Sequence, residues 1–461
     1  MHRPAGRVAL AAMLGLWTCS AWLLNRPGHL SVDSLIQIAE GRSGVFESYN
    51  PLFISVVFGR LTALTGGTVS LVLIATISLA LAAWLLLMRI ERPGALGVAA
   101  TGALLFMPIL LIYPGIVWKD VWFAHAAVLG FALITLRGRW HAFLVESLSL
   151  ALFAFAMLSR QTGILVAGVG VLVLALSAPP PRGPRFPRAR AAVGILARFA
   201  VLFALALGFS LAAKSTAREI TGQPVASGVR LIAVFDIAGM LQRLPQARLD
   251  RFARMGVDTS TFEAAARRNF SAERIDTLNF PPIRGLGRLA VTDVLLQWFD
   301  MVAAHPGTYL AHRGEVYAWL LGLRGQERCL PVHVGYASDT LATKAGIDAP
   351  ASPNASLLYG YARIFVGSPY FSPLTWGVVS SLVLLYLRRR GLCRTPIAGL
   401  QWAGLLYLAS YFPVALSCDF RYTYFSTVAA SLGLMFVFLS GVQPAAGGRG
   451  QRTVVTDRSA R

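Results

Sequence analysis

Five charged residues lie at the borders of apolar segments of the chain. Asp33 follows the first apolar segment, Lys119 and Asp120 precede another, and Arg160 and Arg421 stand in short polar stretches between later ones. A carboxylate can take a proton from a hydroxyl group, and arginine or lysine donates charge-assisted hydrogen bonds to phosphate. These residue types therefore suit a reaction in which a proton is removed while negative charge builds up on a phosphate.

The stretch 31–51 carries the first of these acids. Its apolar residues recur at helical spacing, which places Asp33, Gln37 and Glu40 together on the opposite, polar face. Ser31 can cap this helix, and Asp33 then occupies the first turn, where the helix dipole favours an anion. A short amphipathic helix beside a membrane span suits the plane of the interface. The alternative is an ordinary capped connector whose acids are merely solvated.

Composition indicates a polytopic membrane protein. Hydrophobic residues make up 56% of the 461 residues and charged residues 14%, with a mean hydropathy of +0.60, whereas about a quarter of a soluble domain is charged. The formal net charge is +21, but the basic residues are scattered between apolar segments, which argues against nucleic-acid binding. We assign the charge to membrane topology, to anionic membrane lipids and to an anionic substrate.

The apolar segments predict a mainly α-helical protein with about ten transmembrane helices. Residues 1–213 form an N-terminal membrane domain with interfacial helices at 31–65 and seven spans, and residues 214–370 form a small periplasmic lobe with interfacial helices. Residues 371–441 contain the last spans, and 442–461 form a cytoplasmic tail. The expected spans are 8–24, 69–88, 95–112, 121–136, 142–158, 162–176, 193–213, 374–387, 397–416 and 422–439.

The arginines predict the orientation of these spans. With ten spans, clusters near residues 89–92, 137–139, 182–190, 388–394 and 449–461 all fall on one side, which the positive-inside rule identifies as the cytoplasm. We therefore expect a multi-pass protein of a bacterial inner membrane with both termini in the cytoplasm. The proline-rich stretch 178–187 is expected to be a stiff cytoplasmic linker.

Three short outer loops break the charge rule, because each carries a cation. Lys119 could pair with Asp120, and Arg421 with Asp419, but Arg160 has no acid beside it and needs a partner from elsewhere or a ligand. The alternative is that all three loops bind an anionic, lipid-linked substrate whose phosphate lies at this depth.

The order of these motifs resembles the GT-C class of polytopic glycosyltransferases, which includes aminoarabinose transferases and protein mannosyltransferases. The resemblance rests on an early acid in the first outer helix, a later Asn50-Pro51, the Lys119-Asp120 pair, Arg160 at the start of a span, and an aromatic-rich Asp-x-Arg-Tyr segment that ends at Tyr422. It covers the first 170 residues best and the last 50 moderately.

The resemblance implies a function and a set of roles. It implies a polyprenyl-phosphate-linked sugar as donor and transfer with inversion to a hydroxyl group of an envelope lipid, glycan or protein acceptor. Asp33 matches the catalytic base and Asp120 the second acid, and a group of residues would bind the donor: Lys119, Arg160, Arg421, Gln37 and Tyr422. Ser34 replaces the usual acid after Asp33, so a divalent metal requirement, the subfamily and the acceptor stay open.

Two other functions remain alternatives. A transporter or flippase of a lipid-linked precursor would place polar or broken helices at mid-membrane depth, often repeated in two halves. An O-antigen polymerase or ligase would use the same donor on another fold.

A few polar residues outside these motifs carry weaker expectations. Asp236 lies in an apolar segment, where a structural pairing is favoured over a place in the cleft. The histidines His305, His312 and His333 are expected at the surface or interface, without the spacing of a metal site. Cys329 and Cys418 fall on the outer side, where a disulfide is permitted.

Overall fold

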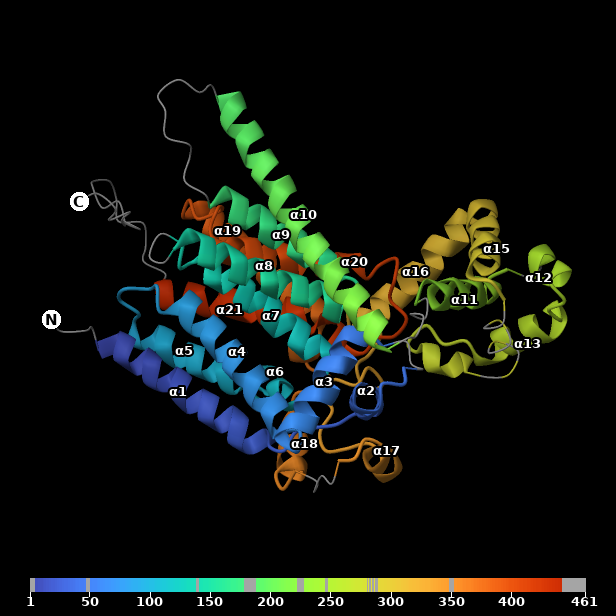
Figure 1. Cartoon of the computed structure of the whole chain (residues 1–461), viewed down its shortest axis with the longest axis horizontal. Helices are drawn as coiled ribbons and strands as arrows, with labels where there is room; N and C mark the ends of the chain where they lie inside the picture. Colours follow the sequence, from blue (N-terminus) through green and yellow to red (C-terminus); the bar gives the residue numbers. More distant parts are fainter. Residues whose placement is uncertain are drawn as a thin grey trace.

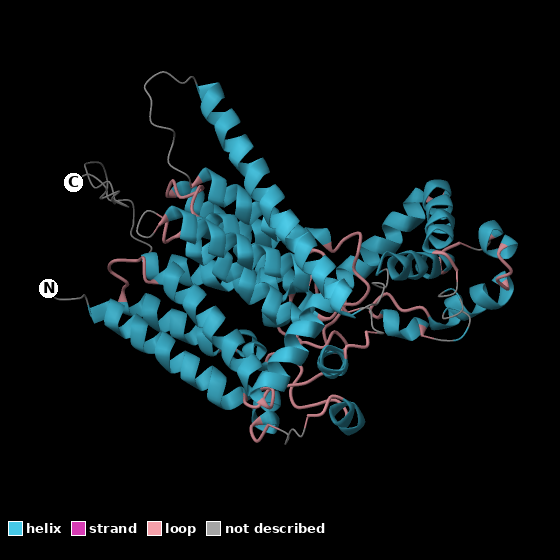
Figure 2. Cartoon of the chain, viewed as in Figure 1, coloured by secondary structure: helices cyan, strands magenta, loops and turns pink. Residues whose placement is uncertain are grey.

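The protein is mainly α-helical. The computed structural model describes residues 5–46, 50–137, 141–177, 188–221, 228–244, 248–279, 281, 283, 286, 289–347 and 352–441. In these residues helices dominate, and the β-structure consists of isolated bridges (Figure 2). The expected linker 178–187 and the tail 442–461 lie outside the described residues.

Long helices pack side by side in one bundle, and a lobe of shorter helices extends from one end (Figure 1). The bundle contains α1 (Ala5–Asn25), α4 (Val69–Leu87), α5 (Ala95–Phe106), α7 (Lys119–Ile134), α8 (Ala142–Ser159), α9 (Gly163–Leu176), α10 (Arg188–Thr221), α19 (Pro373–Arg389), α20 (Pro396–Ser410) and α21 (Tyr424–Ser440). The lobe contains α11 (Gly228–Leu241), α12 (Asp250–Arg254), α13 (Thr259–Asn269), η2 (Ile275–Leu278), α15 (Val291–Ala304) and α16 (Pro306–Leu320).

Short elements lie near the end of the bundle from which the lobe extends (Figure 1). They are α2 (Val32–Ser43), α3 (Leu52–Thr65), α6 (Pro108–Ile112), η1 (Tyr113–Gly115), α17 (Asp339–Lys344), α18 (Ala355–Arg363), η4 (Pro369–Phe371) and η5 (Phe420–Thr423). The helices expected within 31–65 are therefore present as α2 and α3. We call this end of the bundle the lobe end.

The opposite end of the bundle is the basic end, where Arg7, Arg89 and Arg137 lie. Arg7 Nη2 donates to the Met88 carbonyl oxygen at 2.9 Å, and Arg137 Nη1 donates to that of Leu174 at 2.5 Å. Arg89 Nη2 donates to the carbonyl oxygen that follows α7. The first turn of α1 and the ends of α4, α7 and α9 therefore meet, so the arginines gather at one end of the bundle.

Fewer helices meet the requirements for crossing a membrane than the sequence suggested. Among the described residues, α1, α4, α8 and the segment Phe420–Ser440 are long and apolar enough, and a bent pair of helices makes a fifth. The expectation of ten spans is therefore not supported. Several bundle helices have only 14 to 17 residues, below the ~20 that the hydrocarbon core requires.

The expected span 95–112 is broken. α5 ends at Phe106, α6 begins at Pro108, and the two parts meet at an angle of 63°. Met107 takes an extended conformation with ψ 151°, because the residue before a proline avoids the helical region and proline has no N–H to donate.

Helices α2 and α3 are in unusually close contact. A Cβ atom on Gly41 would overlap the backbone at Ser55, and one on Gly59 would overlap the backbone of Gly41. The Arg42 guanidinium then joins α2 to its surroundings, donating to the Thr62 carbonyl oxygen at 2.9 Å and to that of Gly346 at 2.7 Å. This contact fixes the helix that carries Asp33.

We predict that Gly59→Ala destabilises the protein by forcing α2 away from α3. Overpacking of this kind typically costs about 1 to 3 kcal/mol, so the melting temperature in detergent should fall by several degrees. Gly15→Ala is the matched control, since a Cβ atom there meets nothing within 4 Å and alanine favours a helix. Equal melting temperatures for the two variants would contradict the close contact.

Candidate functional site

An extended segment brings three distant parts of the chain together at the lobe end. The His29 backbone N–H donates to the Gly115 carbonyl oxygen at 2.8 Å, and the Val117 N–H donates to that of His29 at 3.0 Å. On the other side, the Leu30 N–H donates to the Gly335 carbonyl oxygen at 2.9 Å. The start of α2 therefore lies beside the start of α7.

The His29 side chain secures this junction as a neutral imidazole. Its Nδ1 accepts from the Gly335 N–H at 3.1 Å, and its Nε2 lies 2.9 Å from Asn25 Oδ1. Burial, together with the nearby His333, lowers the pKa of His29 to about 3. The ring thus keeps one N–H to donate to Asn25 and one nitrogen to accept from Gly335.

Asp33 lies at the first turn of α2, as the sequence predicted. Ser31 and Ser34 form a reciprocal cap at the start of the helix, and Trp118 Nε1 donates to Ser31 Oγ at 2.8 Å. The Asp33 carboxylate is 36% exposed and accepts from Arg421 Nη1 at 2.6 Å. Asp33 is therefore neither fully buried nor merely solvated.

The structure pairs the charged residues differently from their order in the sequence. Arg160 forms an ion pair with Asp120, and their side chains are 12% and 1% exposed. Lys119 Nζ instead donates to Asn50 Oδ1 at 2.8 Å. The expected Lys119–Asp120 pair is therefore wrong, because neighbouring residues on a helix point in different directions. The partner of Arg160 is therefore Asp120 in α7.

Arg421 forms two ion pairs. Its guanidinium reaches Asp33 and also Asp419, whose carboxylate lies 3.3 Å from Nη2. The expected local pair with Asp419 is thus present, but the contact with Asp33 joins residues 388 positions apart.

Aromatic rings cover both arginines. The Arg160 guanidinium carbon lies 4.9 Å from the ring centre of Tyr422 and 5.5 Å from that of Tyr411. The guanidinium carbon of Arg421 lies 5.3 Å from Tyr422 and 5.1 Å from Trp118. Tyr422 therefore lies against both cations, a contact worth about 0.5 to 2 kcal/mol each. Sequence reasoning missed Trp118 and Tyr411, although Trp118 stands directly before Lys119 in the sequence.

Burial and the neighbouring charges shift the pKa values of Asp33 and Lys119. Burial would raise the pKa of Asp33, but the charges of Arg421 and Lys119 and the Arg421 hydrogen bond lower it below its usual value. Burial lowers the pKa of Lys119 to about 7, and the Asp33 charge opposes this only in part. Asp33 is thus ionised at neutral pH, while the charge of Lys119 responds to its surroundings.

The rest of the polar face of α2 is buried. Gln37 is 1% exposed and its Nε2 has no hydrogen-bond partner among the described residues, while Glu40 accepts from Ser55 Oγ at 3.4 Å. The expected solvated polar face is therefore wrong beyond the first turn, since α3 packs against it. Asp33 remains the accessible acid of this helix.

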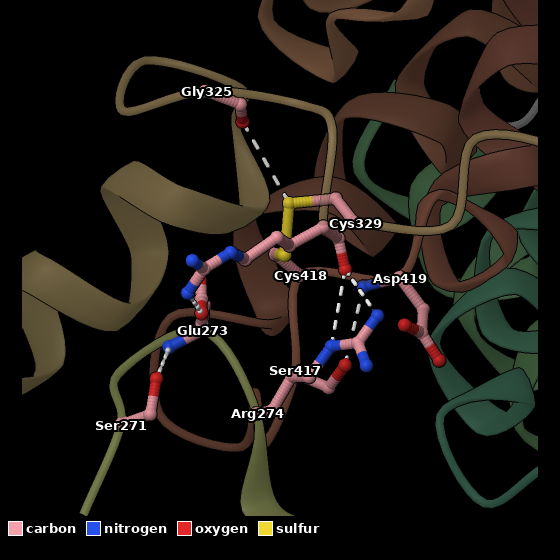
Figure 3. Close-up of a disulfide and its surroundings, with 9 residues drawn as sticks. Ser271, Glu273, Arg274, Gly325, Cys329, Ser417, Cys418 and Asp419 are labelled. Atoms are coloured by element: carbon pink, nitrogen blue, oxygen red, sulfur yellow. Dashed lines mark hydrogen bonds and ion pairs between the residues drawn. A yellow bond between two sulfur atoms is a disulfide. The ribbon is translucent and has the colours of Figure 1, made fainter.

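A disulfide fixes the loop before Arg421. Cys329 and Cys418 are bonded, and the Phe420 N–H donates to the Cys329 carbonyl oxygen at 3.0 Å. Figure 3 shows the disulfide beside Arg274, whose Nε donates to the Arg328 carbonyl oxygen at 3.1 Å. The disulfide that the sequence permitted is present, and it ties the segment of Asp419 and Arg421 to the lobe.

The lobe has its own buried ion cluster. Asp236 lies 2.6 Å from Arg313 Nη2, and 2.9 Å from both His312 Nε2 and Trp298 Nε1. Arg313 Nη1 also donates to the Ala415 carbonyl oxygen at 2.8 Å. The structural role expected for Asp236 is confirmed, whereas the surface position expected for His312 is wrong because that ring is needed to pair the buried acid.

Within the described part of the chain, no group of three or more His, Cys, Asp or Glu side chains could hold a metal ion. Comparison of the chain with family models, with curated proteins and with solved structures finds no match. The function must therefore be argued from the site itself.

We predict that Lys119 titrates near neutral pH. A small amine-reactive acylating reagent should modify Lys119 with a midpoint of about 7, because only the neutral amine reacts. Mass spectrometry reads the extent of modification, and exposed Lys344 provides an internal reference for the reagent. Asp33→Asn should lower the midpoint further by removing a favourable charge. A wild-type midpoint near 10.4, the ordinary lysine value, would refute the assignment.

Proposed function

We propose that this protein is a membrane glycosyltransferase that moves a sugar from a polyprenyl-phosphate-linked donor to a hydroxyl group of an envelope lipid, glycan or protein. One observation carries the proposal. The partly exposed Asp33 carboxylate lies 2.6 Å from Arg421, and its pKa responds to the charge of Lys119. A carboxylate and two cationic side chains, the groups that such a transfer requires, thus occupy one site at the lobe end.

The proposed roles follow from the chemistry of transfer. Asp33 accepts the proton of the acceptor hydroxyl as its oxygen attacks the sugar. The bond from the sugar to the phosphate then breaks, and the electron pair leaves with the phosphate. Arg421 and the protonated form of Lys119 stabilise this charge as it develops, as positioned cations do in a partly dehydrated site. Tyr422 holds Arg421 in place through its ring.

The resting ion pairs suggest how the base becomes active. Asp33 is a weak base while Arg421 neutralises it. A donor phosphate, like a carboxylate, can accept two hydrogen bonds from a guanidinium, so it would compete with Asp33 for Arg421. The same phosphate would favour the charged form of Lys119. Donor binding would then raise the pKa of Asp33 at the moment when a base is required.

Asp120 has a different role in this proposal from the one expected of it. Its carboxylate is 1% exposed and paired with Arg160, so it is poorly placed to meet an acceptor. It would orient Arg160 toward the site as a positioning residue. Gln37 is as buried as Asp120, at 1% exposed, so this proposal gives it no contact with the substrate.

We further propose that all ten bundle helices cross a bacterial inner membrane, with the basic end and both termini in the cytoplasm. The arginines of the basic end favour this orientation. The Cys329–Cys418 bond supports it independently, since disulfides persist on the oxidising side of the membrane. The shorter helices would need local thinning of the bilayer.

The break between α5 and α6 is the feature that favours a transporter or flippase instead, because transporters use discontinuous helices. An assay in detergent separates the two functions. A glycosyltransferase still consumes donor where no compartments exist, whereas a flippase leaves the donor intact.

We predict that Asp33→Asn abolishes transfer while sparing donor binding. Removal of a general base typically costs about 100-fold to 10,000-fold, and asparagine keeps the size of Asp33 while Ser31 still caps the helix. A deletion strain complemented with this variant should still lack the affected sugar when surface glycans are compared by mass spectrometry. Glu40→Gln is the matched control on the same helix and should restore it. Restoration by Asp33→Asn would show that another group takes the proton.

We predict that the cysteines report the topology. In a Cys19→Ser background, an impermeant maleimide should leave exposed Cys393 unlabelled in right-side-out vesicles and label it after permeabilisation. Cys329 and Cys418 should react under denaturing conditions only after reduction. Labelling of Cys393 in sealed vesicles would overturn the proposed orientation.

A further inference from the structure

A cavity lies at the basic end, far from the site described above. It has a volume of about 450 Å³ and is lined by Arg7, Val8, Ala11, Trp84, Leu85, Met88, Arg89 and Leu136. These residues come from the start of α1, the end of α4 and the residues just beyond α4 and α7. Since α7 has 16 residues, its length alone separates the cavity from Lys119 by about 24 Å.

The lining combines two cations with apolar walls. Arg7 and Arg89 are both partly buried, and no acid is among the described residues that line the cavity. Arg7 donates to the Met88 carbonyl oxygen, and Arg89 donates to the Thr135 carbonyl oxygen. The guanidinium groups are therefore held in place at the edge of an apolar hollow.

The apolar walls continue onto the outer surface of the bundle. Val8 is 55% exposed and Trp84 is 42% exposed, so the cavity opens beside side chains that would face lipid chains. An aromatic ring at the end of an apolar helix is typical of the boundary between hydrocarbon and headgroups. An occupant should therefore have a charged group at the end of a long apolar chain.

We propose that this cavity binds one anionic phospholipid, with its phosphodiester between Arg7 and Arg89 and an acyl chain along Val8, Ala11 and Trp84. Arginine donors match the geometry of phosphate oxygens. Basic pockets between helices at the cytoplasmic side are suited to anionic headgroups. The volume falls in the usual range for sites that hold small organic groups. The bound lipid would fasten α1 to α4 and α7.

The charge of the lipid is the first test. The purified protein, stripped of lipid in detergent, is titrated with phosphatidylglycerol, with phosphatidylcholine or with inorganic phosphate, and its melting temperature is recorded. Phosphatidylglycerol should raise the melting temperature well beyond the other two. Equal shifts with phosphatidylcholine would mean that only acyl chains are recognised, and equal shifts with inorganic phosphate would mean a simple anion site. Either result overturns the proposal.

Variants then locate the lipid. Arg7→Gln should weaken phosphatidylglycerol binding roughly tenfold or more, as the loss of a charge-assisted contact does. Arg92→Gln is the matched control, since Arg92 is exposed at the same end and is not among the described lining residues. Ala11→Phe fills the cavity without touching a cation and should also abolish the selective shift. The proposal fails if Arg92→Gln weakens binding as much as Arg7→Gln, or if Ala11→Phe binds normally.

Discussion

Charge neutrality in a poorly hydrated layer is the constraint on which the lobe end depends. Three acids and three cations meet there: Asp33, Asp120 and Asp419 with Lys119, Arg160 and Arg421. Removing Asp120 or Arg160 would leave the other buried charge of that pair without compensation, which typically costs about 3 to 5 kcal/mol. The helices are consequently held in one arrangement by charges as well as by packing. An anion can enter such a site only by exchanging partners with an acid that is already present.

The elements around the site serve this exchange by limiting other movement. The backbone pairing of His29 and Leu30 fixes α2 against α7, and the contact of Gly41 with Gly59 fixes α2 against α3. The Cys329–Cys418 bond and the Arg313 hydrogen bond to Ala415 hold the loop of Arg421 from the lobe side. The side chains of Asp33 and Arg421 can then separate without displacement of their backbones.

Local sequence patterns predicted the positions of the helices better than they predicted the contacts between side chains. The apolar segments located α1, α4, α8 and α21, and the serines identified the start of α2. They did not predict the break at Met107, because the apolar residues continue through it and Pro108 alone marks it. The charged residues of the site were all found from their positions beside apolar segments. Their pairing could not be predicted from the sequence, since Arg160 meets Asp120 and Arg421 meets Asp33 only after distant helices have packed. Trp118 and Tyr411 look like ordinary interfacial aromatics until the arginines lie against them.

The separation of Asp33 and Arg421 by 388 positions has a consequence for the biogenesis of the protein. A ribosome adds about 5 to 20 residues per second, so roughly 20 to 80 s pass between the synthesis of the two residues. During this interval the first helices are already synthesised, but the Asp33 carboxylate has no Arg421 to pair with. The arrangement of charges around Asp33 is therefore completed in one late step, when the segment that carries Arg421 docks at the lobe end.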